Sequence, residues 1–313
     1  MLKPSSRLNI KVLIVLALIV TICAYLFGSE QISAAETASC TTNDLASVSL
    51  MSNSALSSND TNWAGYIAAS DLQNPQASVT SVSASWTVPT VTISTQDTFS
   101  AVWIGIGGFF DNTLIQTGTE QDSIQGQSEY SAWLELLPQT ATTIDRISVS
   151  PGDQITASIQ LVDANTDQWS IYIKDVTKNQ EYTGSYFYPV SQLSAEWIVE
   201  RPGISSRRSR GTLTSLADVG AVKFTTCQTT IGNETGTIRS FPVVQSIMYE
   251  TVESTTGLGL TQLAAVSDPT DNGSSFTVET TSSAIPELSV LMLIPMVIGI
   301  GLLASIIRKR AWR

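Results

Sequence analysis

Short runs of β-branched, aromatic and aliphatic residues recur along the middle of the chain, with turn-forming residues between them. Within these runs apolar and polar positions tend to alternate, which is the period of a half-buried strand. Turn signals stand at 151–153, 163–167 and 178–179. The runs that we predict as strands are 77–88, 98–106, 113–117, 130–136, 145–149, 154–162, 169–175, 195–200, 221–226 and 246–251.

This pattern predicts an all-β protein. Between the two ends of the chain we find no convincing apolar repeat of 3.6 residues, so no long amphipathic helix is expected there. Many short strands at this spacing favour a sandwich or a barrel. The strand-rich stretch is longer than one immunoglobulin-like unit and shows no internal repeat, which suits one large sandwich of two sheets.

The N-terminal end reads as an export signal. Three basic residues precede an apolar run at 12–27, and small residues follow at 33–35. A charged segment, an apolar segment and small residues in this order are typical of a secretory signal peptide. We therefore predict a signal peptide over 1–35, and the alternative is a retained N-terminal anchor.

The C-terminal end reads as a membrane anchor. Residues 288–307 carry no charge and are numerous enough to cross a bilayer core of about 30 Å. The basic tail 308–313 follows, and positive residues stay on the cytoplasmic side, so the middle of the chain is expected outside the cytoplasm, at the cell surface. Pro286-Glu287 resembles a short sorting signal of prokaryotic surface proteins. A sorting or tail-processing enzyme is therefore a possible partner, and cleavage of the tail would release the protein.

Composition divides the remainder into three parts. Residues 36–58 are rich in Ser, Thr, Ala and Asn and are expected to be a linker or a short propeptide. Residues 59–255 hold the strand-like runs and are expected to form the sandwich. Residues 256–287 return to a Ser- and Thr-rich composition, which predicts a stalk between the sandwich and the membrane.

Charge and residue usage exclude several functions. The formal net charge is −11, and nearly all acidic residues lie between the two ends, which disfavours nucleic acid and anionic lipid as partners. The sequence contains no histidine, which excludes Ser-His-Asp and Cys-His catalysis and histidine-ligated zinc. We expect no metal and no cofactor. Cys40 and Cys227 remain outside the signal segment, and they could pair or stay free.

Three strands carry polar residues that could do chemistry. Gln116 shares a strand face with Leu114 and Gly118, and Glu135 shares one with Trp133. In each case the alternative is an ordinary solvated side chain on a half-exposed strand.

The third strand is 195–200, AEWIVE, where Glu196 and Glu200 share one face with Ile198. Glutamate is depleted in strands, and burial would raise its pKa toward the range that acid–base catalysis needs. The alternative is again a pair of ordinary glutamates facing water.

Four segments together resemble a known family. They are, in order, NWAG at 62–65, VWIGI at 102–106 with LIQTG at 114–118, AWLE at 132–135 with Pro138, and AEWIVE at 195–200. Their types and order resemble the glutamic peptidases, also called eqolisins. The segment 216–224 is similar to the strand that follows in that family, so the resemblance covers most of the chain between its two ends.

The resemblance implies a concanavalin-like β-sandwich of two antiparallel sheets and a catalytic pair made of Gln116 and Glu200. It also implies substrate-binding roles for Trp63, Trp103, Trp133 and Glu135.

The sequence departs from the family pattern at Gly107 and Ser131, where fungal members have acids, and at Arg201, which follows the catalytic glutamate. These changes leave the pair itself intact, but they could raise the working pH or alter specificity.

We therefore expect an endopeptidase that acts on protein or peptide substrates outside the cytoplasm, at acidic pH, with a water molecule activated by the Gln/Glu pair. One alternative is a non-catalytic module that binds carbohydrate or peptide on the same sandwich, with the three tryptophans stacking on sugars. The other alternative is a structural surface protein.

Overall fold

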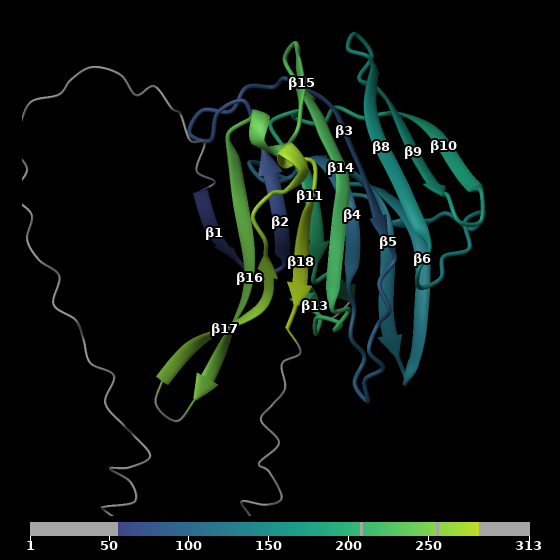
Figure 1. Ribbon diagram of the computed structural model, residues 1–313, viewed down its shortest axis with the longest axis vertical. Coiled ribbons are helices and arrows are strands. Elements are labelled where there is room, and N and C mark those ends of the chain that lie inside the picture. Colours follow the sequence, from purple (N-terminus) through teal and green to yellow (C-terminus); the bar gives the residue numbers. More distant parts are fainter. Residues whose placement is uncertain (1–55, 207–208, 255–256, 282–313) are drawn as a thin grey trace, which may run out of the picture. The chain divides into compact units, whose positions relative to one another are not determined.

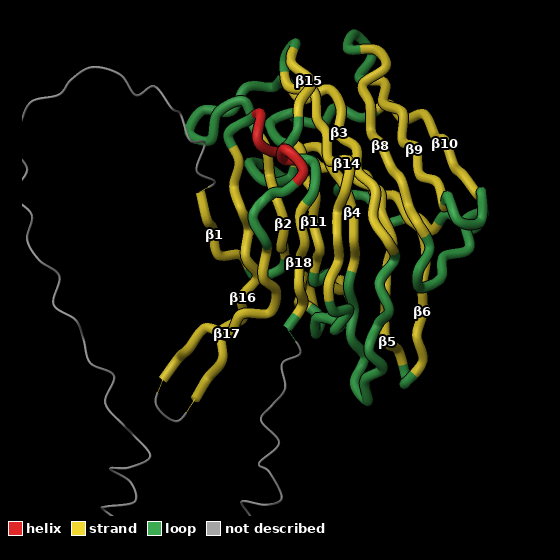
Figure 2. The backbone as a smooth tube through the Cα atoms, viewed as in Figure 1, coloured by secondary structure: helices red, strands yellow, loops and turns green. Residues whose placement is uncertain are grey.

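The computed structural model describes residues 56–206, 209–254 and 257–281. In these ranges nearly all regular structure is β-strand, and helical structure is limited to two short 3-10 turns, η1 (Ile238–Ser240) and η2 (Asp271–Gly273) (Figure 2). The predicted all-β class is confirmed. The predicted signal peptide, membrane helix and basic tail lie outside the described residues. Within the described part of the chain no helix is both long enough and apolar enough to cross a membrane.

The strands form two packed layers, and the first layer lies in front in Figure 1. Each of its strands pairs antiparallel with its neighbours. A short strand, β15 (Glu234–Gly236), extends the β14 edge as a hairpin. In spatial order the layer contains β10 (Gln180–Phe187), β9 (Gln168–Asp175), β8 (Gln154–Asp163), β3 (Val79–Thr87), β14 (Ala221–Ile231) and β18 (Phe276–Thr280).

The second layer packs behind the first, with β4, β5 and β11 against β3, β8 and β14. A separate hairpin, β12 (Gly203–Ser206) with β13 (Ser209–Leu213), follows β11. In spatial order the layer contains β17 (Gly257–Val266), β16 (Val243–Ser254), β2 (Trp63–Ala68), β11 (Ala195–Glu200), β4 (Ala101–Gly107), β5 (Leu114–Ile124), β6 (Gln127–Leu136) and β7 (Thr142–Thr143).

The prediction of two separate antiparallel sheets is corrected in two respects. Strand β17 pairs with β16 over most of its length and with β18 at its last three residues, so one continuous ladder runs through both layers. In addition, β1 (Leu56–Asp60) joins the edge of β16 in parallel. A register shift between Met248 and Tyr249 in β16 accompanies the change of layer, because a bulge bends a strand and increases its twist.

Buried tryptophans tie the two layers together through one large core. Trp86 on β3 donates its indole N–H to the Thr119 hydroxyl on β5 at 3.1 Å, and Trp197 on β11 donates to the Ser83 carbonyl on β3 at 2.9 Å. These bonds satisfy the polar end of large rings that are otherwise buried for their apolar surface.

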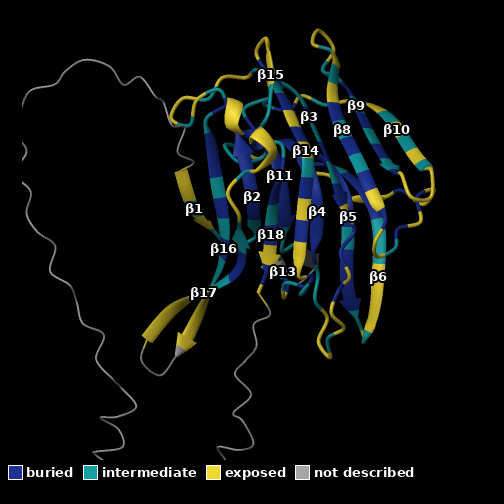
Figure 3. Ribbon diagram, in the orientation of Figure 1, coloured by how far each residue is buried: buried dark blue, intermediate teal, exposed yellow. Residues whose placement is uncertain are grey.

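The central strands β2, β4 and β11 are buried almost throughout (Figure 3). One face of each strand contributes side chains to the core between the layers, and the other face contributes side chains to a second, smaller apolar cluster. This double burial explains the nearly continuous apolar run AVWIGIG in β4, where a half-exposed strand would alternate.

One predicted strand is absent from the structure, and several observed strands were not predicted. Residues 145–149 form no strand; Ile147 and Val149 are buried from a loop in which the Ile147 N–H bonds the Ile144 carbonyl, so their spacing serves packing alone. Strand β10 was not predicted, although Tyr182 and Tyr186 alternate on it and pack on the core.

The predicted borders of the sandwich are also corrected. Strand β1 begins at Leu56, inside the expected linker 36–58. More importantly, β17 and β18 lie within the expected stalk 256–287 and complete the main ladder. The Ser- and Thr-rich composition misled the prediction, because hydroxyl side chains can occupy the exposed face of a strand as easily as a linker.

Gly65 supports a first prediction. It lies in β2 between Ile198 and Ser246 with φ +153°, and an added Cβ would come within 2.0 Å of the Trp197 carbonyl oxygen. We expect Gly65→Ala to lower the free energy of unfolding by about 3 kcal/mol or more, because backbone cannot move aside in the middle of a sheet.

The matched control is Gly126→Ala in the β5–β6 turn, where φ is +74° but no atom lies near an added Cβ. Only the backbone conformation opposes this change, at a cost of about 1 kcal/mol. Chemical denaturation of both variants measures the difference, and equal losses would show that the close approach of β2 and β11 is unimportant.

Candidate active site

Five neighbouring strands of the second layer present their outer side chains in register. We call this surface the cleft face. Because strands lie about 4.8 Å apart, residues paired across the ladder form rows on one face. The three rows are Trp63, Glu200, Ala101, Glu120 and Ser131; then Gly65, Ile198, Trp103, Gly118 and Trp133; then Ile67, Glu196, Gly105, Gln116 and Glu135.

The strand faces predicted from alternation are confirmed. Leu114, Ile198 and Trp133 belong to the smaller apolar cluster on the cleft face, whereas Ile115 and Trp197 belong to the core between the layers. Gln116, Glu135 and Glu200 therefore project from the same side of the sheet, although the chain separates them widely.

A cavity of about 310 Å³ opens on the cleft face and brings four of the predicted site residues together. Trp63 and Trp103 stand beside it, with their rings edge-to-face at a centroid distance of 5.1 Å. The cavity is large enough for part of a peptide. Its lining residues are Ala101, Gln116, Glu120, Trp133, Glu135, Thr140, Ala141, Glu200, Pro202 and Gly203.

Glu200 is held in a pocket of low polarity. The Trp103 indole N–H donates to its Oε2 at 2.8 Å. Burial raises the pKa of Glu200 to about 7, and the indole N–H groups of Trp103 and Trp63 oppose part of that rise because they favour the carboxylate. A carboxyl with this pKa can both accept and release a proton near neutral or mildly acidic pH.

Asn62 adds a second polar contact to Glu200. Its amide nitrogen can lie 3.3 Å from Glu200 Oε1. With the amide turned over, the nitrogen donates to Asp60 at 2.9 Å and the oxygen accepts from the Trp63 indole at 3.3 Å. The turned amide satisfies both of its ends and puts its oxygen beside Glu200, an arrangement that suits a protonated carboxyl.

Gln116 is oriented by Glu135. Its Nε2 donates to Glu135 Oε2 at 2.6 Å, which leaves the second hydrogen of that nitrogen available in the cleft. Gln116 is only 4% exposed, and its Oε1 has no partner in the described part of the protein. Burial raises the pKa of Glu135, and the Gln116 amide opposes that rise.

Glu196 does not reach the cavity. It is fully buried, and neither carboxylate oxygen has a hydrogen-bond partner among the described residues. Burial raises its pKa well above the ordinary value, with the nearby charge of Asp111 as a smaller cause. The interpretation of Glu196 as a solvated glutamate is therefore wrong, and its burial favours the neutral form of the carboxyl.

Sequence reasoning missed two polar residues near the pair. Glu120 lines the cavity and accepts a hydrogen bond from the Ser131 hydroxyl at 3.0 Å. Alternation from Gln116 along the same strand could have found it. Asn62 was noticed only as part of a motif, and no strand pattern indicates its approach to Glu200.

The departures from the family pattern have local causes. Gly107 has φ +86°, and an added Cβ would lie 2.4 Å from the Thr113 carbonyl oxygen, so no acid fits there. Arg201 donates to the Thr214 carbonyl and forms an ion pair with Glu250 at 3.4 Å.

Cys227 is buried as a free thiol, while Cys40 lies outside the described residues.

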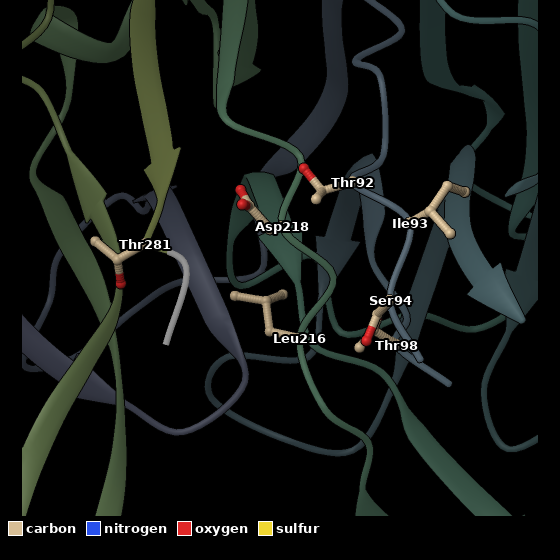
Figure 4. A pocket seen from close by; sticks show the side chains of 7 residues that line it. All are labelled: Thr92, Ile93, Ser94, Thr98, Leu216, Asp218 and Thr281. Atoms are coloured by element: carbon tan, nitrogen blue, oxygen red, sulfur yellow. The ribbon is translucent and has the colours of Figure 1, made fainter. Parts of the chain in front are cut away.

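A different cavity, of about 250 Å³, lacks the same chemistry (Figure 4). The single ionisable side chain of its lining, Asp218, already accepts from the Gly220 N–H at 3.1 Å and the Thr280 hydroxyl at 3.3 Å. This arrangement stabilises a turn and offers no pair for proton transfer. The lining consists of Thr92, Ile93, Ser94, Thr98, Leu216, Asp218 and Thr281.

The fold is that of solved glutamic peptidases. Scytalido-glutamic peptidase, crystallised with a transition state analog inhibitor, matches with a TM-score of 0.56 and 21% sequence identity, over 71% of this chain and 99% of that one. SCP-B, an eqolisin family member solved with the tripeptide Ala-Ile-His, matches with a TM-score of 0.53, the same identity and the same coverage.

The sequence comparisons identify the family. The model of the Peptidase A4 family matches residues 61–270. Aspergillopepsin-2 from Aspergillus niger is 27% identical over 198 residues, and the match spans 56% of this chain and 66% of that protein, just under two thirds. The chain belongs to the Peptidase A4 family, so its resemblance to the glutamic peptidases is confirmed.

Glu196 generates a second prediction. Because the folded state keeps its proton to higher pH than the unfolded chain, the free energy of unfolding falls as pH rises above about 4.3, by up to about 1.4 kcal/mol per pH unit. Glu196→Gln removes this group, and we expect its unfolding free energy to fall less steeply than that of the wild type between about pH 5 and 7.

Chemical denaturation at a series of pH values measures both slopes. Glu234→Gln is the control, because Glu234 is exposed and makes the same change in formal charge. A slope in Glu196→Gln that equals the wild-type slope would mean that Glu196 ionises normally in the folded protein.

Proposed function

We propose that this protein is an endopeptidase whose catalytic pair is Gln116 and Glu200. The observation that carries the proposal is the shared cavity, in which an oriented amide and a carboxyl of raised pKa face the same space. Membership in a family of glutamic peptidases supports it. Protein or peptide chains are the proposed substrates, and Trp63, Trp103, Trp133 and Glu135 are proposed to shape the site.

In the proposed mechanism a water molecule lies between Gln116 and Glu200. The Glu200 carboxylate takes a proton from the water as its oxygen attacks the carbonyl carbon of the peptide bond. The tetrahedral intermediate then breaks its C–N bond, and the protonated Glu200 gives that proton to the leaving nitrogen. No covalent bond to the enzyme forms in this sequence.

Gln116 would stabilise the intermediate. Its second Nε2 hydrogen can donate to the oxyanion, while the bond to Glu135 at 2.6 Å fixes the amide in that direction. One well-placed donor of this kind contributes about 3 kcal/mol, or roughly 10²–10³ in rate. Glu135 is thus proposed to position Gln116, and Trp103 to position Glu200.

We propose a mildly acidic working range. Below about pH 7 an increasing fraction of Glu200 is protonated and cannot act as the base. Above that range the other buried carboxyls, Asp122 and Glu196 among them, are forced to ionise, which lowers the stability of the fold. Activity is therefore expected to peak where the two effects balance.

The burial of two of the three tryptophans, with Trp63 the one that is partly exposed, disfavours the sugar-binding alternative. A stacking platform for a sugar needs an exposed ring face, but Trp103 is 0% exposed and Trp133 is 4% exposed. The location outside the cytoplasm, the membrane anchor and the tail-processing partner stay predictions, since the segments that carry them lie outside the described residues.

The third prediction concerns the pair itself. Gln116→Ala should lower kcat by about 10²–10³ through loss of the oxyanion donor. Glu200→Gln should abolish cleavage, because its amide cannot accept the proton of the water. Both are measured by digestion of a denatured protein substrate at about pH 4 to 7, with circular dichroism to verify the fold.

Glu196→Gln is the matched control, because it makes the same substitution on the same strand and the same face. It should retain most of the activity. If the Gln116→Ala or the Glu200→Gln variant keeps near-full activity, the assignment of the pair is wrong. If Glu196→Gln alone is inactive, the wrong glutamate has been chosen.

The fourth prediction concerns the pH profile. We expect kcat/KM to rise from about pH 4 toward pH 7 as Glu200 ionises. Trp103→Phe removes the N–H that favours the carboxylate, so the rising limb should move to higher pH as well as falling in height. A maximum near pH 3 that does not move in the variant would indicate that Glu200 enters the reaction protonated.

A further inference from the structure

The lining of the catalytic cavity has a rigid part and a part that needs an anchor of its own. Most of the lining comes from β4, β5, β6 and β11, whose spacing is fixed by the ladder. The rest comes from two short segments outside these strands, 140–141 after β6 and 202–203 after β11. We call Pro202 and Gly203 the exit segment, because the chain leaves the proposed base Glu200 through it.

The exit segment is closed by Thr214. The Thr214 backbone N–H and its hydroxyl both donate to the Pro202 carbonyl, at 3.1 Å and 2.8 Å. Gly203 begins β12 and pairs with Leu213 at the end of β13. The base of the β12–β13 hairpin is therefore hydrogen-bonded directly beside the cavity.

Arg201 joins this base to the main sheet. Its backbone N–H donates to the Asn62 carbonyl at 2.8 Å, and its Nε donates to the Thr214 carbonyl. Its Nη1 lies 3.4 Å from Glu250 Oε2 on β16, which is separated from β11 by β2 in the ladder. A guanidinium is planar and carries several donors, so one side chain can hold both partners in fixed directions.

The Arg201 side chain is more enclosed than the cations of the other described ion pairs. It is 15% exposed, whereas Lys174 and Lys178 are 25% and 30% exposed. Solvent and salt therefore screen its contact with Glu250 less than theirs. Loss of either partner would leave a largely enclosed guanidinium with unpaired donors, which favours the closed arrangement of the exit segment.

The charge of Arg201 is not directed at Glu200, although the two residues are adjacent in sequence. Neighbouring residues of an extended chain project to opposite sides, and Glu200 projects onto the cleft face. Burial, three hydrogen-bond donors and the charge of Glu135 account for the raised pKa of Glu200, and Arg201 is not among these causes. The contacts of Arg201 thus lie with the exit segment and β16.

We propose that Arg201 is a positioning residue that holds the exit segment at the cavity and so governs the binding of the peptide, not the chemistry at Glu200. This inference rests on the proposed peptidase function. An acidic side chain at this position has no donor for the Thr214 carbonyl and would repel Glu250. The arrangement therefore depends on the arginine by which this chain departs from the family pattern.

The test measures steady-state kinetics on labelled, oxidised insulin B chain at pH 6. We expect Arg201→Ala to raise KM about tenfold and to leave kcat within about twofold, because a misplaced lining weakens contacts that substrate and transition state share. Arg201→Lys should give a KM between the two. A lysine can still pair with Glu250, but a single ammonium does not reproduce the planar bond to Thr214.

The pH profile distinguishes positioning from an electrostatic effect on the base. In Arg201→Ala the rising limb of kcat/KM should keep the wild-type midpoint, whereas Trp103→Phe moves it to higher pH. A midpoint that shifts in Arg201→Ala would show that the arginine acts on Glu200 through its charge, and the proposal would be wrong.

Two further variants complete the test. Glu250→Gln removes the charge partner but leaves the Thr214 bond, and it should raise KM about two- to fivefold, as expected for a partly exposed ion pair. It serves if Arg201→Ala folds poorly. Lys174→Ala also removes the cation of an ion pair, on β9 in the other layer, and should keep the wild-type KM. A wild-type KM in Arg201→Ala, or in Glu250→Gln when it alone folds, overturns the proposal.

A binding measurement separates this proposal from the peptidase proposal. The same labelled chain is titrated at pH 6 with Glu200→Gln and with Glu200→Gln/Arg201→Ala, and fluorescence anisotropy reports binding. Binding about tenfold weaker in the double variant supports the role of Arg201 even if the wild type cleaves nothing, in which case only the catalytic assignment fails. Equal binding, or binding by neither variant, contradicts the role of Arg201 whether or not cleavage occurs.

Discussion

The close packing of the Trp103 indole against backbone is the contact on which the site depends. An added Cβ at Gly118 would lie 2.6 Å from Trp103 Cβ, and one at Gly105 would lie 2.7 Å from the far edge of the ring. Only glycine leaves room for the Trp103 side chain at these two positions of β4 and β5. In that position its N–H reaches Glu200, so two residues without side chains determine where the proposed base stands.

Buried carboxyl groups without a basic partner among the described residues are a second recurring feature of the molecule. Glu120, Asp122, Glu135, Glu196 and Glu200 all have raised pKa values, with burial as the largest cause in each case. A protein that must be stable at neutral pH would pair such groups with lysine or arginine. The raised pKa values favour the neutral form of these groups, which needs no basic partner, in a chain with 16 lysine and arginine residues against 27 acidic ones.

Local pattern predicted the strands and the faces of their side chains well, because alternation depends on neighbours in sequence. AEWIVE was correctly divided into Glu196, Ile198 and Glu200 on one face and Trp197 on the other. Local pattern could not predict how deeply each side chain is buried. Glu196 and Glu200 look alike in sequence, yet Glu196 is fully buried and Glu200 lines a cavity. The ladder through β17 was missed for a different reason, since β17 pairs with its sequence neighbours β16 and β18 but lies in a Ser- and Thr-rich stretch that was interpreted as a stalk.

The continuous ladder also bears on how the protein would resist cleavage by its own proposed peptidase activity. Proteases bind their substrates as extended chain, for which a free strand edge is the best imitation. The strands that carry the proposed pair, β11 and β5, are hydrogen-bonded on both sides, and β10 and β7 stand at the two ends of the order. Fraying at these two strands, or at β1 on the edge of β16, would leave β11 and β5 paired on both sides, so autolysis is expected to begin at the edges.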